Sequence, residues 1–460
     1  MRGFATLAEI ASKLRDGSID PIELVDTAMR GSRSAPGVFV SLNERARDAA
    51  AQSADRRRRG TPLSRLDGIP FAVKDMIDLA GSSTTRGSLT RRDSPHASRD
   101  AAVVAHLRAA GMIPIGKTNL SEFAFSGLGL NPHFGTPTAR FDGVAPRAPG
   151  GSSSGSAIAV QRGLVAAAIG TDTAGSVRIP AAFNGLTGFR ASCGRYDMTG
   201  VHPLAVTLDT LGPIAHTVED CMLLDSAMQG RPDHGPTEAT LRDARFIVDS
   251  LSLDDPTLEP DVGRNLLDIM ARLRACGACV EVRPVQTLSL TRELIATHGW
   301  LGAIEAWTLY RETLEGSEAQ RLDPRVRHRL LAARDIDSNA EARIRAERPR
   351  LMSSMLAELG DAILVTPTVK HVAPPLAALE SDARQFALMN LETLSLTMPG
   401  SLLDMPGVAM PSGVDRQGLP TSLLFSAPQR HDTRLLRICL AVDAALQGEA
   451  PIELPVEKHR

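Results

Sequence analysis

Three short segments of the chain contain side chains that could carry out chemistry together. The segment "GIPFAVKDMIDLAG", residues 68–81, places Lys74 among apolar residues. The segment "GGSSSGSAIAV", residues 150–160, holds a run of serines between glycines, and "GTDTAGSVRIPAAFNG", residues 170–185, places Ser176 in a turn of small residues. A serine hydroxyl becomes a nucleophile when a base removes its proton, and a buried, neutral lysine can be that base.

The segment 170–185 has the strongest local pattern of the three. A strand, "VAAAIG", leads into a tight turn of Gly, Thr and Ser, and a helix with Pro180 near its start follows. Such a turn directs several backbone N–H groups toward one point beside Ser176, as acyl transfer requires for its oxyanion. An anion-binding turn or a structural helix cap fits the same residues. The segment by itself leaves these alternatives open.

Two other motif matches lack the context that they require. Ser153 is the centre of a G-x-S-x-G match to the nucleophile elbow, which needs a strand before the serine, but "FDGVAPRAP" precedes it and is a loop broken by prolines. The segment "GMIPIGKT", residues 111–118, matches a phosphate-binding loop, but a helix precedes it and its intervening residues are apolar. We expect Lys117 and Thr118 to begin the next helix, "TNLSEFAF", and to bind no nucleotide.

Lys74 is one of five lysines in a chain that contains 46 arginines. Its place in the middle of an apolar strand is poorly explained by a solvated role. The structural alternative is an ion pair with Asp75 or Asp78, although Asp75 would face the other side of the strand. Lowering the pKa of a lysine from ~10.4 to about 7 requires about 4.6 kcal/mol, which a largely desolvated site can supply.

Composition and charge exclude several classes of protein. The 460 residues are 43% hydrophobic and carry a formal net charge of -2, so no nucleic acid or anionic membrane is expected as a partner. The longest alanine-rich run, "AIAVQRGLVAAAIG", is interrupted by Gln161 and Arg162 and is too short to cross a bilayer. The N-terminal residues lack the apolar segment of a secretory signal. We therefore expect a cytoplasmic protein.

The five cysteines do not suggest a disulfide framework. Cys276 and Cys279 form a C-x-x-C in "RLRACGACVEV", where we expect a helix to end at Gly277 and a strand to begin. Both thiols should pack at this junction. No second C-x-x-C and no matching histidine pair completes a zinc site, so we expect neither a metal nor a cofactor.

Four separated segments resemble, in order and spacing, the motifs of the amidase signature family: "GIPFAVKDMID", "GKTNLSEFAFSGLGLNPHFGTP", "APRAPGGSSSGSAIAV" and "GTDTAGSVRIPAAFNGLTGFR". The N-terminal "LAEIASKLRDGSIDPIELVDTA" and the C-terminal "DAILVTPT" and "MPGVAMPSGVDRQGLPTSLLFSAP" also resemble that family. The resemblance covers most of the chain and is weakest between about 230 and 350.

The resemblance and the alternation of helices and strands predict an α/β fold. The family fold is one large domain, here residues 1–460, with a central mixed β-sheet covered by helices on both faces. Its core motifs would occupy residues 65–225, a variable and mainly helical region would follow over about 230–360, and core strands with a C-terminal helix would return over 361–447.

The family uses a Ser-cisSer-Lys triad, and each member can be carried over by motif. The nucleophile would be Ser176, the last serine of "DTAGS". The bridging serine would be Ser152, preceded by a cis peptide bond, and the base would be Lys74 of "FAVKD". In this scheme Lys74 takes the proton of Ser176 through the hydroxyl of Ser152.

The resemblance also assigns supporting roles around the nucleophile. The oxyanion would be bound by the backbone amides of Thr173, Ala174, Gly175 and Ser176. Many family members have glycine where this chain has Ala174, which preserves the amide but limits the local backbone conformation. The loop would be supported by Asp172, Arg178 and Ser153, and Ser153 and Ser154 would cap the following helix.

The resemblance implies an amidohydrolase that converts a linear carboxamide, a small molecule, into a carboxylate and ammonia or an amine. Three alternatives stay open: the amidase subunit of a tRNA-dependent amidotransferase, a Ser-His-Asp esterase that uses Ser153, and a non-catalytic binding protein with the same fold. The oligomeric state is also open, and a homodimer is compatible with the sequence.

The substrate pocket is expected to draw on two parts of the chain. The first is the segment after Lys117, with the candidate residues Phe125, Gly127, Leu128 and Gly129. The second is the variable region, with the candidates Trp300, Trp307, Lys370 and His371. The tryptophans fit helix packing at least as well as a pocket wall.

Overall fold

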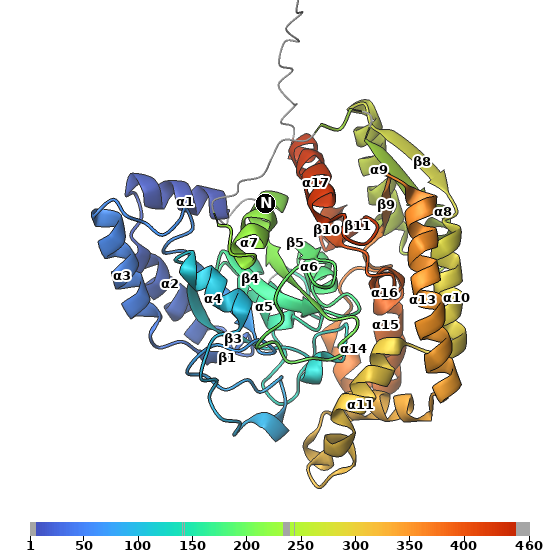
Figure 1. The fold of residues 1–460 in the computed structure, drawn as a ribbon, viewed down its shortest axis with the longest axis horizontal. Coiled ribbons are helices and arrows are strands. Elements are labelled where there is room, and N and C mark those ends of the chain that lie inside the picture. The colour runs from blue at the N-terminus through green and yellow to red at the C-terminus, as the bar shows by residue number, and fades with distance from the viewer. Residues whose placement is uncertain (1–5, 140, 142, 233–239, 243, 448–460) are drawn as a thin grey trace, which may run out of the picture.

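An eleven-stranded mixed sheet runs through the computed structural model and carries the helices on its two faces (Figure 1). The structure describes residues 6–139, 141, 143–232, 240–242 and 244–447. The strands follow one another across the sheet in the order β1-β3-β2-β4-β6-β5-β10-β11-β9-β7-β8. The expected α/β fold with a central mixed sheet is therefore confirmed.

The strands are β1 (Phe39–Leu42), β2 (Pro70–Lys74), β3 (Ile113–Thr118), β4 (Ala167–Asp172), β5 (Thr187–Arg190), β6 (Thr210–Ala215), β7 (Arg245–Asp249), β8 (Cys279–Arg283), β9 (Ile363–Pro367), β10 (Gly407–Val414) and β11 (Pro420–Ser426). Strand β2 is parallel to both of its neighbours, β3 and β4, and β7 is parallel to β8 and β9. The other neighbouring strands are antiparallel. The parallel trio β3-β2-β4 is the part of the sheet that positions the site.

The helices are α1 (Leu7–Asp16), α2 (Pro21–Arg33), α3 (Ala46–Arg58), α4 (Ala102–Ala109), α5 (Ser154–Gln161), α6 (Arg178–Phe183), α7 (Val218–Met228), α8 (Ser250–Leu253), α9 (Pro260–Ala275), α10 (Gln286–His298), α11 (Leu301–Glu315), α12 (Pro324–Ala332), α13 (Ser338–Leu359), α14 (Leu376–Ser381), α15 (Ala383–Leu394), α16 (Thr397–Leu402) and α17 (Asp432–Gln447). Apolar faces of α1, α4, α7, α9 and α17 share one hydrophobic cluster, and those of α2, α3, α5 and α6 share a second.

Alternation along β2 shows that these two clusters lie on opposite faces of the sheet. Phe71 and Val73 belong to the cluster that contains α4 and α7, whereas Ala72 belongs to the cluster that contains α5. Because side chains alternate along a strand, Lys74 shares the side of Ala72 and α5. Lys74 is the last residue of β2 and not its middle, as the sequence had suggested. The strand therefore ends where its lysine meets the serine segment.

A short helix follows each of the two serine segments. Helix α5 begins at Ser154, directly after the serine run, and is buried along nearly its whole length. Strand β4 leads through residues 173–177 into α6, which is the strand–turn–helix expected around Ser176. The expected helix at Lys117 is wrong: Lys117 and Thr118 end strand β3, and only a short 3-10 turn, Glu122–Ala124, follows.

The variable region is mainly helical, as expected, but it also extends the sheet. Strand β7 was not anticipated, and together with β8 it forms the edge beyond β9. Cys276 and Cys279 flank the turn between α9 and β8, and both are exposed rather than packed. The expectation that these thiols pack at the junction is therefore wrong, because the outer edge of the sheet is open to solvent there.

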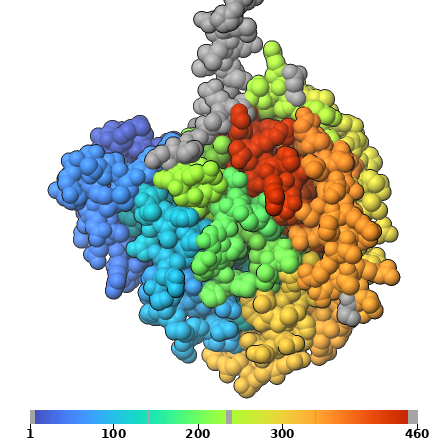
Figure 2. Space-filling model, viewed as in Figure 1, coloured from blue at the N-terminus to red at the C-terminus, as the bar shows by residue number. Residues whose placement is uncertain are grey.

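The two ends of the sheet carry separate groups of helices. Figure 2 shows the N-terminal helices in blue on one side of the visible surface and the segment around α13 in orange on the other, with α17 in red next to the orange side. Among the described residues, no helix combines the length and the apolar character that a membrane crossing requires.

Candidate active site

Lys74 is enclosed completely, and its amine hydrogen-bonds to neutral oxygen atoms of the described residues. Its Nζ lies 2.7 Å from Ser152 Oγ, 2.7 Å from Thr171 Oγ1 and 3.3 Å from the Thr171 carbonyl oxygen, and its side chain is 0% exposed. Parallel pairing of β2 with β4 brings Thr171 to this position, because Val73 is opposite Ile169. The base expected from sequence thus contacts the serine that was expected to bridge it to the nucleophile.

Neither acid that was considered as an ion-pair partner of Lys74 contacts it. Asp75 binds Lys117, with Nζ 2.7 Å from Oδ1 and both side chains fully buried. Asp78 binds His202 and Thr84 instead. Burial therefore acts on Lys74 without a carboxylate at ion-pair distance, and it lowers the pKa of Lys74 from 10.5 to about 7 against the opposing charges of Asp172 and Asp209. Near neutral pH a large fraction of this amine carries no charge.

Ser152 and Ser176 lie in different segments of the chain, and a backbone hydrogen bond joins the two segments. The peptide bond between Gly151 and Ser152 is cis, as the family resemblance implied. The N–H of Ser153 donates to the carbonyl oxygen of Ser176 at 3.3 Å, which places the loop that carries Ser176 directly against the serine run. Ser152 is 0% exposed and Ser176 is 5% exposed. A small molecule can therefore reach Ser176 more readily than the two groups behind it.

Asp172 organises the loop that carries Ser176. It forms a two-pronged ion pair with Arg178, with Nε 3.0 Å from Oδ2 and Nη2 2.9 Å from Oδ1. Its oxygens also accept the N–H groups of Gly175 and Val177 at 2.8 and 3.1 Å. Burial raises the pKa of Asp172, but the charges of Arg178 and Arg190 hold it at about 2. The loop is thus folded around a permanently ionised carboxylate.

This arrangement changes the set of amides that can bind an oxyanion. The N–H of Gly175 donates to Asp172, so it is not free for a ligand. The amides of Thr173, Ala174 and Ser176 donate to no acceptor among the described residues. Of the four expected donors, the Gly175 amide is therefore occupied, and the oxyanion role of the other three stays a prediction. Glycine is needed at position 175 for a different reason: its φ is +136°, a backbone conformation that residues with a side chain rarely adopt.

Ala174 and Thr173 are held by side chains from distant segments. Thr397 Oγ1, in α16, donates to the carbonyl oxygen of Ala174 at 2.5 Å. Thr173 Oγ1 donates to Asp209 Oδ1, also at 2.5 Å. Ala174 has an ordinary negative φ, since it is not among the non-glycine residues with positive φ. The replacement of the glycine that many family members have is thus accommodated without strain.

Ser153 and Ser154 do not cap helix α5 with their side chains, although capping was expected. Ser153 occupies the N-cap position, but its hydroxyl donates to the carbonyl oxygen of Thr171 at 3.4 Å. The Ser154 hydroxyl is buried and has no partner in the part of the chain that the structure describes. Ser153 thus joins α5 to β4, the strand that precedes the turn, and no histidine contacts it within the described residues.

The segment around Phe125 adjoins the serine run, as expected for a pocket wall. The carbonyl oxygen of Gly127 accepts the N–H of Gly151 at 2.8 Å. Asn390 Oδ1, in α15, accepts both the Gly127 N–H and the Ser126 hydroxyl at 2.9 Å. A Cβ on Gly129 would lie 2.3 Å from the Gly150 carbonyl oxygen, so only glycine permits this close approach. Leu128 packs in a separate buried cluster with Phe386 and does not face the serines.

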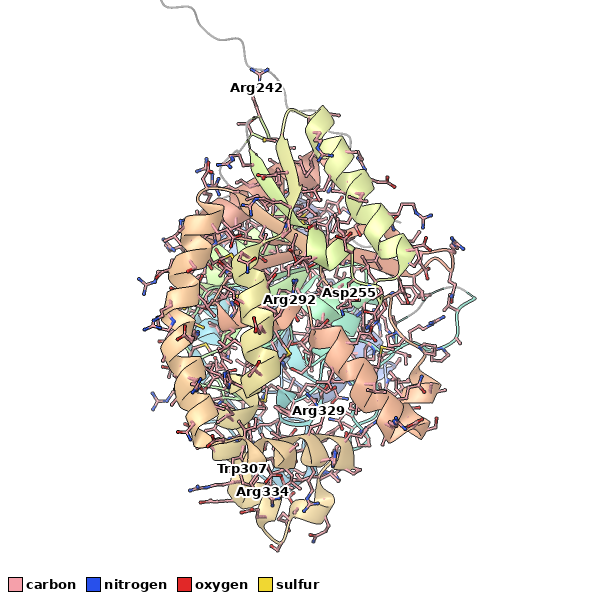
Figure 3. All side chains as sticks on the ribbon, turned by 90° about the vertical axis from the view of Figure 1, so that its right-hand side faces the viewer. Arg242, Asp255, Arg292, Trp307, Arg329 and Arg334 are labelled. Carbon is pink, nitrogen blue, oxygen red and sulfur yellow. The ribbon has the colours of Figure 1, made fainter. Side chains whose placement is uncertain are left out.

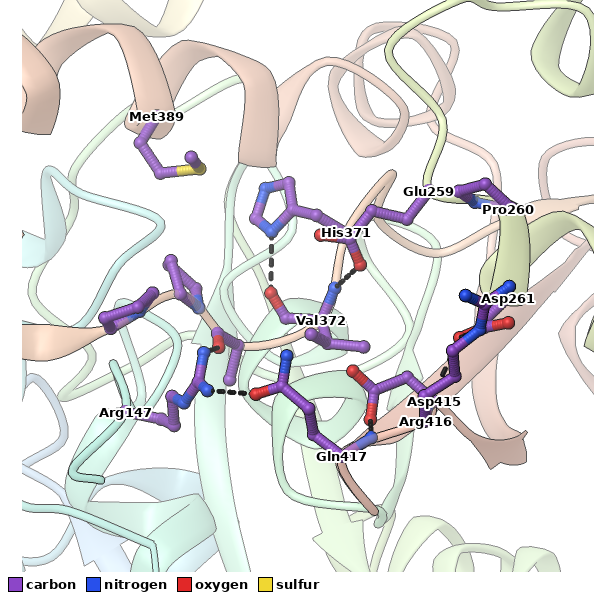
Figure 4. A pocket seen from close by; sticks show the side chains of 13 residues that line it. Arg147, Glu259, Pro260, Asp261, His371, Val372, Met389, Asp415, Arg416 and Gln417 are labelled. Atoms are coloured by element: carbon purple, nitrogen blue, oxygen red, sulfur yellow. Dashed lines mark hydrogen bonds and ion pairs between the residues drawn. The ribbon is translucent and has the colours of Figure 1, made fainter. Parts of the chain in front are cut away.

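The candidates from the variable region make their contacts with groups other than Lys74 and the two serines. Lys370 forms an ion pair with Asp255, with Nζ 2.6 Å from Oδ2. His371 is buried against Phe183 and borders a cavity of about 360 Å³, seen in Figure 4, which neither Ser152 nor Ser176 lines. Trp300 and Trp307 are half-buried and pack against apolar clusters, which fits their expected role in helix packing.

Sequence reasoning missed Thr171, Asn390 and Thr397 in this region, and it missed Arg329 of α12, whose Nη1 donates to the carbonyl oxygen of Phe125 at 2.6 Å. Thr171 could have been found from the pairing of β2 with β4. Lys74 ends β2 and Thr171 lies near the end of β4, so parallel pairing brings the two residues together. The other three come from helices of the variable and C-terminal regions, where the family motifs give no register. Their contacts exist only in the folded chain.

Comparison with known proteins decides the family. The model of the amidase family, described as "Amidase", matches residues 32–436. The chain belongs to the amidase family. The 2-amino-5-chloromuconic acid deaminase of Comamonas testosteroni is 32% identical over 98% of this chain and 98% of its own. One component of the glutamyl-tRNA(Gln) amidotransferase of Deinococcus radiodurans is 30% identical over 99% of this chain and 100% of its own.

A solved structure agrees with this membership. The structure titled "Crystal structure of amidase" superposes with a TM-score of 0.84 and 29% identity, and it covers 96% of this amidase and 99% of the other chain. The chain is therefore an enzyme of the amidase family that hydrolyses amide C–N bonds.

Proposed function

We propose that this amidase hydrolyses a linear carboxamide to a carboxylate and ammonia or an amine, through an acyl-enzyme on Ser176. The observation that carries the proposal is the enclosed contact between Lys74 and Ser152, with Nζ 2.7 Å from Oγ and a lysine pKa of about 7. A base with a pKa near the working pH is the most effective proton acceptor for such a reaction. A hydroxyl between base and nucleophile can accept and donate a proton in the same step.

Acylation moves one proton along this chain of groups. Ser176 Oγ attacks the amide carbon, and the carbonyl π electrons move onto the oxygen. Ser152 takes the proton from Ser176 and passes its own to neutral Lys74. The amides of Thr173, Ala174 and Ser176 supply hydrogen bonds to the oxyanion, and they are most effective in a site from which water is excluded. The C–N bond then breaks, and the leaving nitrogen takes the proton from Lys74 by the same route.

Deacylation repeats the sequence with water in place of Ser176. Lys74 accepts a proton from the water through Ser152, and the resulting hydroxide attacks the ester carbon. The second oxyanion collapses, the C–O bond to Ser176 breaks, and Ser176 recovers its proton. The products are a carboxylate and the free enzyme, so no other reactant is needed.

Labelling with a fluorophosphonate probe tests the nucleophile. We expect intact mass to show one adduct on the wild type, none on Ser176→Ala, and one on Ser153→Ala, which serves as the matched control. Hydrolysis of a panel of simple amides should follow the same order. An adduct that persists in Ser176→Ala and disappears in Ser153→Ala would replace this proposal by the esterase alternative.

A second candidate is the amidase component of a tRNA-dependent amidotransferase. It is favoured by the 30% identity to the amidotransferase component of Deinococcus radiodurans, which extends over 99% of this chain and 100% of the other. This function requires partner chains. Amide hydrolysis by the purified chain alone, at a rate that cell extract does not increase, would exclude it.

A further inference from the structure

The cavity of about 360 Å³ in Figure 4 is separate from the catalytic residues. Its walls come from Arg147, from the start of α9, from residues 371–375 after β9, and from the turn between β10 and β11. Lys74, Ser152 and Ser176 do not line it. Sites for small molecules have volumes of about 300–1,000 Å³. The cavity therefore has room for a small ligand of its own.

Arg147 is the cation on one wall of this cavity, and it is half-buried. Its Nη2 donates to Gln417 Oε1 at 2.6 Å, and its Nη1 donates to the Ala373 carbonyl oxygen at 3.3 Å. Both acceptors are neutral, and no carboxylate of the described residues lies within ion-pair distance of Arg147. A charge that is partly withdrawn from water is costly unless it is paired. The described fold supplies no counter-ion to this guanidinium.

Two carboxylates that border the same cavity lack a cation. Asp415 Oδ1 accepts two backbone N–H groups of its own turn at 2.8 Å, and its Oδ2 accepts none from the described residues. Glu259 Oε2 accepts the N–H of Val372 at 2.9 Å, and no described lysine or arginine pairs with Glu259. Figure 4 shows Arg147 and Asp415 on opposite sides of the Gln417 side chain. The opposite charges therefore face one cavity without meeting each other.

The other charged groups nearby already have partners. Lys370 pairs with Asp255, which Figure 3 labels, and its Nζ lies 2.6 Å from Oδ2. Asp261 pairs with Arg264, and its Oδ2 accepts the backbone N–H of Arg416 at 3.2 Å. Within the part of the chain that the structure describes, one cation and two carboxylates of the cavity thus stay without an ion-pair partner.

The rest of the lining includes apolar side chains. They belong to Val372, Pro374, Pro375 and the half-buried Met389 of α15. Methylene groups of a ligand gain free energy when they are withdrawn from water against such surfaces. The cavity thus combines both signs of charge with an apolar wall.

We propose that this cavity is a second binding site, which takes a short zwitterion with its carboxylate at Arg147 and its ammonium group at Asp415 and Glu259. The ligand class is an amino acid whose two charges are separated by a few methylene groups. A guanidinium binds a carboxylate through two parallel hydrogen bonds, and an ammonium group donates three. A ligand with a single charge would leave one wall without its counter-ion. The inference does not depend on the proposed amide hydrolysis.

Calorimetric titration of the full chain tests the site with glycine, γ-aminobutyrate and 5-aminovalerate. These probes differ only in the number of methylene groups between their charges. We expect at least one of them to bind the wild type with a Kd of about 1 mM or below, and to bind Ser176→Ala equally well. The carboxylate and the amine of the same chain length each lack one charge. Each should bind at least about tenfold more weakly, the worth of one hydrogen bond to a charged group.

Two variants of the cavity wall locate the ligand. Arg147→Met and Asp415→Asn should each weaken binding of the zwitterion at least about tenfold. Asp415→Asn keeps an oxygen for the turn, so it tests the site even if Arg147→Met disturbs the fold. Arg416→Met is the matched control and should bind like the wild type, because Arg416 also borders the cavity but its side chain is 84% exposed.

Four results would overturn the inference. The first is the absence of binding by all three zwitterions, and the second is equally tight binding of the matching carboxylate or amine. The third is undiminished binding in Arg147→Met or in Asp415→Asn. The fourth is loss of binding in Ser176→Ala, which would place the ligand at the catalytic serine. Loss of amide hydrolysis with intact binding of the zwitterion would count against the proposed function alone.

Discussion

Asp75 pairs with Lys117 and not with Lys74, its neighbour in the chain. Both partners are fully buried, and the Asp75 carboxylate also accepts the N–H of Thr85 at 3.0 Å. The ion pair with Lys117 holds the carboxylate of Asp75 away from Lys74, although the two residues are neighbours in the sequence. Lys74 is left among neutral oxygens, which is the condition for its low pKa.

Loss of Lys117 should therefore cost stability. In Lys117→Met the buried Asp75 carboxylate is left without its cation, and we expect the free energy of unfolding to fall by about 3–5 kcal/mol. Urea unfolding followed by circular dichroism measures it. The matched control is Arg108→Met, whose partner Asp100 lies nearer the surface, and it should cost less than about 1 kcal/mol. Equal losses in both variants would show that the Asp75 pair has no special role.

The activity should depend on the ionisation of Lys74. The base must be neutral, so kcat/KM should rise with pH and level off above about 7, the pKa of Lys74. In Lys74→Met the rate of hydrolysis should fall by a factor of about 10²–10⁴. In Asp209→Asn the rise of kcat/KM with pH should move to lower pH, because the negative charge of Asp209 favours protonated Lys74. A limb that stays in place would remove Asp209 from this account.

Thr171 should orient Lys74 and tune its pKa. Thr171→Val removes the hydroxyl that lies 2.7 Å from Nζ and keeps the shape of the side chain. The ammonium form loses an acceptor, so we expect the limb of the pH profile to shift downward and kcat to fall by about tenfold or more, the worth of one hydrogen bond to a charged group. A pH titration of kcat/KM on the variant, beside Thr171→Ser as the control that keeps the hydroxyl, measures both effects. A profile in Thr171→Val that matches the wild type would contradict this role.

Gly175 should tolerate no side chain. Its φ is +136°, and a Cβ there would lie 2.5 Å from Thr397 Oγ1 and 2.6 Å from Ile179 Cδ1. We expect Gly175→Ala to lose most of the labelling of Ser176 and to lower the unfolding free energy by about 1–3 kcal/mol. Gly194→Ala is the matched control, because Gly194 also has a positive φ but no atom within 4 Å of the new Cβ. If both variants label like the wild type, the shape of the loop is not limiting.

The sequence predicted the parts of the site that belong to short motifs. Lys74, Ser152 and the turn around Ser176 could be located because each lies in a segment with its own pattern of glycines, serines and apolar residues. The apolar runs in the sequence also predicted the three strands β2, β3 and β4 and the hairpin of β10 and β11. The general α/β fold followed from these elements.

What could not be predicted depends on how distant segments meet. The commitment of the Gly175 amide to Asp172 is a matter of side-chain rotamer, which the motif does not encode. The pairing of Asp75 with Lys117 depends on how β2 and β3 align, and their register shifts between Phe71 and Val73. Arg329 is one of 46 arginines in the sequence, and only the packing of α12 against the Phe125 segment distinguishes it from the solvated majority.

Two of the contacts that tie the loop of residues 173–178 to α16 have a consequence for synthesis on the ribosome. Thr397 holds the Ala174 carbonyl, and Ser401 Oγ accepts a hydrogen bond from Arg178 Nη2 at 2.7 Å. Both anchors are translated more than two hundred residues after the loop that they hold. A nascent chain that already contains Lys74, Ser152 and Ser176 therefore lacks the contacts of Thr397 and Ser401 with residues 173–178 until most of the polypeptide has been synthesised. We therefore expect hydrolytic capacity to appear only when the C-terminal part of the chain, which carries α16, has been added.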